Sequence, residues 1–304
     1  MMKSLMITGA TGFIGRSLLR QLAPAKYEHV YCLGRTPSAA AESHAPPDGF
    51  RFIKGDLCEP EAYADYLAGC ESVVHLAATT GKAARDEYFK VNTEGTRLLV
   101  EECRRRGVRN FLYVSTIAVK YPDKTRYYYA QSKEQGERVV RDSGLNYTIV
   151  RPTIVIGAGA AAWAALSAIA RKPVILLPGD GTARIQPIYI EDLVRGLLTV
   201  LDDALFAGET YELGGPEEIT FEHFLRRIHS RYYRREPPVV HLPLKPLVAA
   251  LGFVEEHLGA VLPVSAGQLA AFSNDGTVAP NTLHRRLVSQ MKDVEQMLRQ
   301  VIAS

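Results

Sequence analysis

Near its N-terminus the chain reads Leu5-Met6-Ile7-Thr8-Gly9-Ala10-Thr11-Gly12-Phe13-Ile14-Gly15. The apolar residues predict a buried strand, and the glycines lie where that strand turns into a helix beginning near Phe13. Glycine lets the backbone turn tightly and approach a pyrophosphate, while a helix N-terminus favours the negative charge. A glycine pattern alone is a weak signal, because turns use glycine for many reasons. The strand–turn–helix context makes this one a predicted dinucleotide loop.

The first 150 residues repeat this alternation of short apolar runs and longer helical patterns. Further strands are expected at Val30–Leu33, Phe52–Ile53, Val73–Leu76, Phe111–Val114 and Tyr147–Val150, and helices at Phe13–Leu22, Pro60–Ala68, Asp86–Arg106 and Tyr128–Ser143. Strands alternating with helices imply right-handed crossovers and a parallel sheet covered on both faces. The predicted fold class is α/β, a doubly wound parallel sheet of the Rossmann type.

The regular alternation of apolar runs and helical patterns ends after Arg151. The later segments are an Ala-rich stretch (Ala160–Ala170), a strand (Ile185–Ile190), a helix (Glu191–Leu201), a strand (Thr210–Leu213), a helix (Phe221–Tyr232) and a largely helical remainder. We predict a dinucleotide-binding domain over residues 1–155, with returning segments near 185–215. Residues 156–304 are expected to form a smaller, mostly helical substrate-binding lobe. The stretch Thr36–Gly49, rich in Ala, Ser and Pro, is expected to be a mobile loop.

Composition and charge exclude several classes of protein. Hydrophobic residues make up 47% and charged residues 23%, and the net charge is +3, which excludes a disordered chain and gives no indication of nucleic acid as a partner. The four cysteines lack CxxC spacing and the eight histidines lack ligand spacing, so we expect reduced thiols and no metal. The apolar region 242–264 is interrupted by charges, and no signal peptide is expected. We expect a cytoplasmic protein with a small-molecule substrate and no integral membrane segment; a homodimer is a possible assembly.

Arg35 bears on the choice of dinucleotide. NAD enzymes of this kind place an acidic residue about 20 positions after the glycine loop, and here that position holds Arg35. A carboxylate would repel a 2′-phosphate, whereas a guanidinium can pair with it. Thr36 and Ser38 would add hydroxyl donors. The sequence therefore favours NADP over NAD, with an exposed strand-end arginine as the alternative interpretation of Arg35.

Tyr129 and Lys133 lie four residues apart and therefore share one face of a predicted helix. An ordinary tyrosine, with a pKa near 10, exchanges protons poorly at neutral pH, and a nearby ammonium is expected to lower that pKa. Such a pair also arises by chance on a solvated helix face. Its position after the strand that ends at Ser115 and Thr116 favours a catalytic interpretation, because a hydroxyl there can orient a substrate oxygen.

Seven motifs occur along the chain in the same order as in a known protein family. The motifs are TGATGFIG (Thr8–Gly15), GDL (Gly55–Leu57), HLAA (His75–Ala78), VNTEGT (Val91–Thr96), VST (Val114–Thr116), YAQSK (Tyr129–Lys133) and RPTIVIG (Arg151–Gly157). Together they resemble an extended short-chain dehydrogenase/reductase of the NAD-dependent epimerase/dehydratase group, over residues 3 to 215. The ordered series is more specific than any single motif.

The resemblance implies roles for individual residues. The cofactor phosphates would be held by Gly9, Thr11, Gly12, Phe13, Ile14 and Gly15. Asp56 and Leu57 would border the adenine, and Ala77 and Ala78 would line the dinucleotide. Tyr129 would be the acid–base, Lys133 would bind the nicotinamide ribose, and Thr116 would orient the substrate, with Ser115 as the alternative. The predicted cofactor contacts are completed by Leu76, Asn92, Ser115, Tyr129 and Pro152.

Asn92 has support from helical spacing as well. With Tyr88, Gly95 and Leu99 it forms one helical stripe, on which Gly95 allows close approach to the sheet. Asn92 would then be a buried amide in need of partners. A structural hydrogen bond and a role near the cofactor or an active-site water are both open.

Two departures from the family pattern concern the substrate. Thr116 and Tyr129 lie 13 positions apart, whereas sugar-nucleotide enzymes of this family have a longer loop there. Ile185-Gln186 stands where those enzymes usually have Arg-Asp, and Arg184 is displaced by one position, which on a strand points it to the other face. This stretch looks more like the atypical branch related to an accessory subunit of respiratory complex I.

Two hypotheses follow from these patterns. The first is an NAD(P)-dependent oxidoreductase or epimerase that moves a hydride between nicotinamide and a carbon bearing OH or C=O, for example in a nucleotide sugar. The alternative is a dinucleotide-binding structural or regulatory subunit without turnover. The basic run 226–235 stands apart from both. It could attract an anionic substrate, membrane headgroups or RNA, although such a run is more often a solvated helix face.

Overall fold

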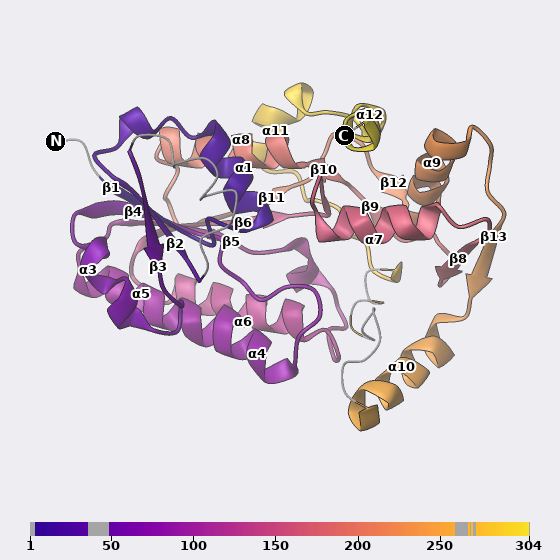
Figure 1. Ribbon diagram of the computed structural model, residues 1–304, viewed down its shortest axis with the longest axis horizontal. Coiled ribbons are helices and arrows are strands. Elements are labelled where there is room, and N and C mark those ends of the chain that lie inside the picture. The colour runs from indigo at the N-terminus through magenta and orange to yellow at the C-terminus, as the bar shows by residue number, and fades with distance from the viewer. Residues whose placement is uncertain (1–3, 36–48, 259–266, 268, 270–271, 304) are drawn as a thin grey trace.

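The computed structural model describes residues 4–35, 49–258, 267, 269 and 272–303 (Figure 1). Its centre is a seven-stranded sheet made of β1 (Ser4–Thr8), β2 (Val30–Gly34), β3 (Phe50–Lys54), β4 (Cys70–His75), β5 (Asn110–Val114), β6 (Asn146–Pro152) and β11 (Glu209–Leu213). The order is β11-β6-β5-β4-β1-β2-β3, and every neighbouring pair is parallel. The order reverses between β1 and β4, and ligands of doubly wound sheets bind at such a point. The predicted doubly wound Rossmann sheet is confirmed.

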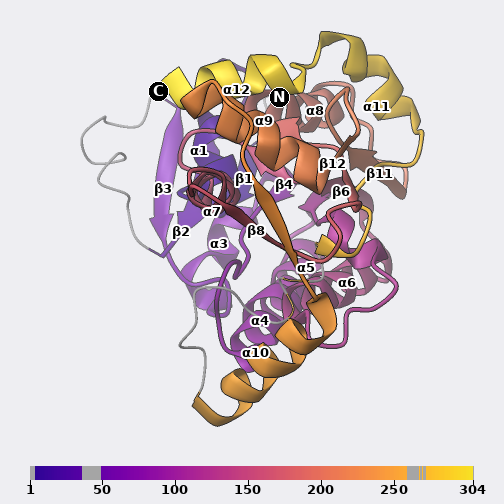
Figure 2. The same ribbon diagram turned by 90° about the vertical axis from the view of Figure 1, so that its right-hand side faces the viewer.

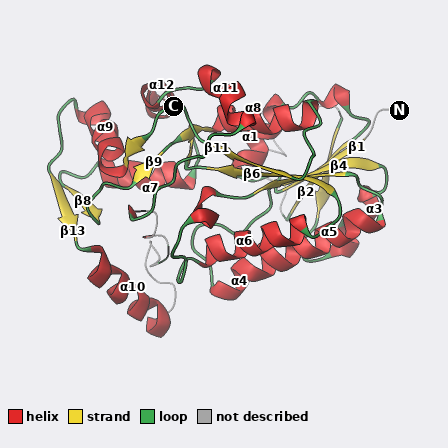
Figure 3. Ribbon diagram, turned by 180° about the vertical axis from the view of Figure 1, so that it is seen from behind, coloured by secondary structure: helices red, strands yellow, loops and turns green. Residues whose placement is uncertain are grey.

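Helices cover both faces of this sheet (Figure 3). One layer holds α3 (Ala64–Leu67), α4 (Arg85–Phe89), a π-helical turn (Lys90–Gly95), α5 (Thr96–Arg105) and α6 (Tyr128–Arg141). The other holds α1 (Phe13–Gln21), α8 (Ile190–Asp202), α11 (Thr282–Leu287) and α12 (Val294–Ala303). Because side chains alternate along a strand, Leu5 and Ile7 enter the core on one face and Met6 enters the core on the other. Short 3-10 turns lie at Pro24–Lys26, Pro60–Ala62, Ile117–Lys120 and Val288–Gln290.

A smaller lobe lies beyond the carboxyl ends of the strands, at the right of Figure 1. Its helices are α7 (Ala161–Ala170), α9 (Phe221–Tyr233) and α10 (Leu244–Leu258), and its parallel strand pair is β8 (Ile175–Pro178) with β13 (Val239–Leu242). Two further small sheets pair β7 (Val155–Ile156) with β10 (Ile188–Tyr189), and β9 (Arg184–Ile185) with β12 (Ile219–Thr220). The chain returns from this lobe to the sheet through α8 and β11, and again through α11.

The prediction of one continuous strand over Ile185–Ile190 is wrong. The structure has two short strands there, β9 and β10, which are separated by Gln186-Pro187. Gln186 is buried there, where its Nε2 donates to the Gly215 carbonyl at 2.6 Å and its Oε1 accepts from the Val278 N–H at 3.0 Å. Proline adds no N–H to a ladder at this point. These long-range partners, which no local pattern reveals, break the strand. Of the expected loop Thr36–Gly49, all but Gly49 lies outside the described residues.

No helix in the described part of the chain is long and apolar enough to cross a membrane. No group of three or more His, Cys, Asp or Glu side chains among the same residues is arranged to hold a metal ion. All four cysteines are free thiols.

Candidate functional site

A cavity of about 200 Å³ opens where the ends of β1 to β4 turn into the following loops. Nine of the residues predicted to bind a dinucleotide line it: Gly9, Thr11, Gly12, Arg35, Asp56, Leu57, Leu76, Ala77 and Ala78. Leu33, Gly34, Gly55, Thr79 and Val91 also line the wall. The other predicted cofactor residues lie outside this lining: Phe13, Ile14, Gly15, Asn92, Ser115, Tyr129, Lys133 and Pro152. The structure thus gathers the glycine loop and the strand ends into one hollow.

The glycine loop is shaped by close backbone approach. Gly9 has φ +67°, and a Cβ there would lie 2.6 Å from the Ala77 nitrogen. A Cβ on Gly15 would lie 2.3 Å from the Gly9 carbonyl oxygen, so α1 packs directly against the turn before it. Gly12 caps α1, and no side chain among the described residues caps its first turn. Free N–H groups at a helix N-terminus beside a cavity suit a phosphate, so this loop fits a dinucleotide.

Arg35 and Asp56 bring opposite charges to the same cavity wall. Arg35 is exposed at the end of β2, next to Gly34. Asp56 is partly committed to its own turn, because its Oδ1 accepts from the Cys58 N–H at 2.8 Å. Among the residues expected at the 2′-phosphate, Thr36 and Ser38 lie outside the described residues. Among the described residues that line this cavity, Arg35 is the one with a positively charged side chain.

A buried hydrogen-bonded chain, absent from the sequence predictions, joins Thr8 and His75, which directly precede Gly9 and Leu76 of the cavity lining. Thr96 donates its hydroxyl proton to the Asn92 carbonyl at 2.7 Å, so its oxygen accepts from His75 Nε2 at 3.0 Å. His75 Nδ1 then accepts from the Thr8 hydroxyl at 2.6 Å, and Thr8 itself accepts from the Ala77 N–H at 3.2 Å. Burial and the Lys133 charge hold the pKa of His75 well below its usual range. A neutral imidazole therefore ties β1, β4 and α5 together.

Asn92 connects the cavity wall to α6. Its Oδ1 accepts from the Thr79 N–H at 2.7 Å, and its Nδ2 donates to the Thr79 carbonyl and the Ser132 hydroxyl, both at 3.0 Å. Ser132 in turn donates to the Tyr129 carbonyl at 2.9 Å. Asn92 lies in the π-helical turn, an irregularity that is frequent at functional sites. The buried amide expected from the helical stripe has all these partners, and they fix α6 beside Thr79.

Tyr129 lies half-buried in the first turn of α6, with Thr116 as a hydrogen-bond partner. Burial raises the pKa of Tyr129 to about 12, although the Thr116 bond acts in the opposite direction. The expectation that Lys133 lowers this pKa is therefore wrong for the protein as described. Lys133 is itself 2% exposed, and burial lowers its pKa to about 7. Its Nζ lies 4.0 Å from the ring centroid of Tyr113.

Thr116 and Ser115, the two candidates for orienting the substrate, have different surroundings. Thr116 contacts Tyr129 and also accepts from the Ala118 N–H at 3.2 Å. Ser115 is buried, and its hydroxyl oxygen has no hydrogen-bond partner among the described residues. Pro152 ends β6, opposite Leu213 of β11, and is buried. Of the alternatives in the sequence, Thr116 is the one in contact with the tyrosine.

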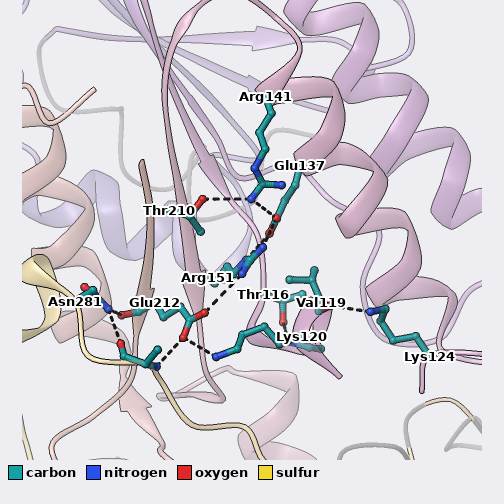
Figure 4. A network of polar contacts seen from close by, with 12 residues as sticks. Thr116, Val119, Lys120, Lys124, Glu137, Arg141, Arg151, Thr210, Glu212 and Asn281 are labelled. Carbon is teal, nitrogen blue, oxygen red and sulfur yellow. Dashed lines mark hydrogen bonds and ion pairs between the residues drawn. The ribbon is translucent and has the colours of Figure 1, made fainter. Parts of the chain in front are cut away.

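A network of alternating positive and negative side chains joins α6 to β6 and β11 (Figure 4). Arg151 of β6 binds the fully buried Glu137 through two contacts, of 2.8 and 2.6 Å, and Arg141 adds a third at 2.9 Å. Arg151 also faces Glu212 of β11 at 3.6 Å, and Glu212 pairs with Lys120 at 2.9 Å. Burial alone would raise the pKa of Glu137, but the hydrogen bonds and charge of Arg151, together with the charge of Arg141, outweigh that effect and lower it.

A second cavity, of about 940 Å³, lies in the smaller lobe. It is lined by Gly179, Asp180, Thr182, Ala183, Arg184, His241, Leu242, Pro243, Leu244, Lys245, Phe272, Ser273 and Asp275. A row of rings extends towards it from Tyr129, with centroid distances of 6.0 Å to Tyr127 and a further 6.3 Å to Tyr121. Asp275 helps raise the pKa of Tyr121, after burial, and so lies close to this row. Asp275 of the cavity lining therefore lies near Tyr121, at the far end of this row from Tyr129.

Comparisons with known proteins agree with this geometry. A family model described as NAD dependent epimerase/dehydratase family matches residues 5–214. Ceramide reductase of Caulobacter vibrioides is 31% identical over 63% of this chain and 59% of its own length, so the match spans less than two thirds of that relative. Subunit 9 of the mitochondrial NADH dehydrogenase (ubiquinone) 1 alpha subcomplex of Arabidopsis thaliana is 26% identical over 91% of this chain and 71% of that protein.

A solved structure also shares the fold. UDP-glucuronic acid 4-epimerase from Bacillus cereus, crystallised in complex with NAD, superposes with a TM-score of 0.67. The alignment covers 79% of this chain and 87% of that chain at 24% identity. At this identity the likeness is one of architecture, a parallel sheet with helices on both faces.

Proposed function

The chain belongs to the NAD-dependent epimerase/dehydratase family, and we propose that it is an NAD(P)H-dependent reductase of a small carbonyl compound. The observation that carries the proposal is the placement of Tyr129, Thr116 and Lys133. Two of them lie on α6, which Asn92 joins to the wall of the dinucleotide cavity. A bound nicotinamide cofactor would supply the hydride.

The charge states favour reduction over the reverse reaction. With a pKa near 12, Tyr129 is a neutral phenol at neutral pH and can donate its proton to an oxygen that receives negative charge. Thr116 would hold that oxygen in line with the phenol. Lys133, with a pKa near 7, can be charged or neutral, and its proposed role is to bind the nicotinamide ribose, as the family resemblance implies.

We predict a preference for NADP(H) from Arg35. The wild-type chain should bind NADPH more tightly than NADH, and Arg35→Asp should reverse that order, because a carboxylate repels a 2′-phosphate. One lost charge-assisted contact is worth about 1.5–3 kcal/mol, roughly tenfold or more in affinity. Fluorescence titration of both nucleotides measures the ratio. Lys54→Asp, an exposed site at the end of β3, is the matched control, and equal wild-type affinities would contradict the proposal.

Lys133 should leave a signature in the pH dependence of stability. Its pKa is 10.5 unfolded and about 7 folded, so between these values the unfolded chain binds the extra proton and the free energy of unfolding rises with pH. Lys133→Met lacks this dependence. Relative to wild type, the variant should therefore be ~1–3 kcal/mol more stabilised at about pH 6 than at about pH 9. Denaturant unfolding of the protein without nucleotide measures it, and a pH-independent difference would contradict the burial argument.

A second candidate function is a dinucleotide-binding subunit without turnover. It is supported by the similarity to the Arabidopsis thaliana NADH dehydrogenase subunit, which extends over 91% of this chain. The two proposals differ in one measurement, NADPH oxidation in the presence of carbonyl compounds. The screen includes nucleotide sugars and, after the name of the Caulobacter vibrioides relative, oxidised ceramides. Tight NADPH binding without oxidation across the screen would favour the subunit.

A further inference from the structure

The strand pair β8 and β13 has an apolar outer face. Val240 stands next to Leu176 across the parallel ladder, and they are 47% and 55% exposed. Val174, on the same side of the chain as Leu176, is 39% exposed. Between them, Ile175 and Leu177 point inward and are fully buried with the core that includes α7 and α9. The pair is therefore covered on its inner side and bare on its outer side.

A bare face is unusual for such strands. Parallel sheets are normally covered on both faces, which is why their strands are apolar throughout. Figure 2 views the molecule from this side, with the orange β13 in front, α9 above it and α10 below it. Exposing neighbouring large apolar side chains is unfavourable unless another apolar phase covers them.

Basic residues stand at one end of this face. Arg171 and Lys172 lie shortly before β8, and Arg234 and Arg235 lie shortly before β13, so the parallel pairing brings the four towards the same end. All four are exposed, and no ion pair within the described ranges involves them.

The ion pairs of the same segment explain why the charge gathers at this end. In the basic run 226–235, Arg226 pairs with Glu222, and Arg227 pairs with Glu217 at 2.8 Å. Arg231 faces Glu295 at 3.8 Å. Glu236, which follows the run, is directed to Arg226 and Ser230. The last two arginines of the run thus remain for an external partner.

We propose that this face docks the protein on the surface of an anionic lipid membrane. Exposed aliphatic side chains beside a basic cluster combine the two interactions that hold a peripheral protein at a bilayer, shallow apolar insertion and attraction to anionic headgroups. The charge is local, since the whole chain carries only +3. The proposal is independent of the reductase activity, because none of these residues lies at the dinucleotide cavity or on α6.

Vesicle sedimentation of the full chain tests the proposal. The wild-type protein should bind vesicles containing one-third phosphatidylglycerol in phosphatidylcholine, bind pure phosphatidylcholine far less, and dissociate as salt is raised. Arg234→Glu/Arg235→Glu and Leu176→Asp/Val240→Asp should each weaken binding by about tenfold or more. The matched controls are Arg104→Glu/Arg109→Glu and Tyr66→Asp, at exposed positions on another part of the surface, and these should bind like wild type.

Fluorescence and oligomeric state complete the test. Leu176→Trp should be quenched by brominated lipids in the anionic vesicles, whereas Tyr66→Trp should not. The proposal is overturned by an absence of vesicle binding, or by binding that the control variants weaken as much as the variants of the face. It is also overturned if light scattering shows a dimer that Leu176→Asp/Val240→Asp dissociates, because a second copy would then cover the face.

Discussion

Replacing Tyr129 by phenylalanine should lower the turnover of carbonyl reduction by about 10²–10⁴-fold, the usual contribution of a positioned proton donor. Phenylalanine keeps the ring that lies 6.4 Å from Tyr88 and 6.0 Å from Tyr127, so packing is preserved and only the hydroxyl is lost. The affinity for NADPH should therefore stay within a factor of about two, because the cavity lining is unchanged. Stopped-flow NADPH oxidation and a separate binding titration measure the two quantities.

Tyr127→Phe is the matched control, since it removes a hydroxyl two residues away in the same aromatic row. It should leave turnover nearly unchanged, because the hydrogen bond to Thr116 belongs to Tyr129. If Tyr129→Phe retains full turnover, Tyr129 is not the proton donor and the mechanism is wrong. If both variants lose activity equally, the row of rings acts through packing, and the assignment to one hydroxyl fails.

Local patterns predict the sheet domain well. Each of the six strands from β1 to β6 contains an apolar run that predicts it. For the inner strands the reason is that a strand buried on both faces is apolar along its length, whereas the edge strand β3 also exposes Arg51 and Lys54. The glycine loop is predicted for a similar reason, since Gly9 and Gly15 occupy positions where a Cβ would collide with backbone. The strands and the glycine loop are each determined by residues that are consecutive in the sequence.

Features made by residues far apart in the chain are not predicted. The His75 chain joins Thr8, Thr96 and Asn92 from three elements, and only the folded arrangement shows that they meet. The pKa of Tyr129 was expected to fall because the spacing puts Lys133 on the same helix face. It rises because burial outweighs the lowering effect of the Thr116 hydrogen bond. How deeply a helical side chain is buried cannot be deduced from its spacing.

The smaller lobe illustrates the same limit. Parallel β8 and β13 are separated by about 60 positions of sequence that include α8, β11 and α9. Their short apolar runs give no sign of pairing before the fold is known. The cytoplasmic location, the homodimer, the domain boundaries and the individual cofactor contacts stay predictions.

The buried pair of Glu137 and Arg151 should be among the strongest contributors to stability near the site. Arg151→Met removes both contacts of 2.8 and 2.6 Å and leaves a fully buried carboxylate with Arg141, which is 36% exposed, as its remaining paired cation. Breaking a buried pair from one side typically costs ~3–5 kcal/mol, because the surviving charge is uncompensated. We expect about 3 kcal/mol here, since Arg141 compensates part of the charge.

Chemical denaturation of Arg151→Met and Arg138→Met provides the comparison. Arg138 is 68% exposed and meets Glu134 at 3.4 Å on the same helix, so its loss should cost less than about 1 kcal/mol. Glu137→Gln/Arg151→Met should recover part of the loss, because the double change leaves no buried charge between the two positions. A single variant as stable as Arg138→Met would mean that Arg141 alone neutralises Glu137. The charge network would then hold α6 through Arg141, and β6 would contribute only its backbone pairing.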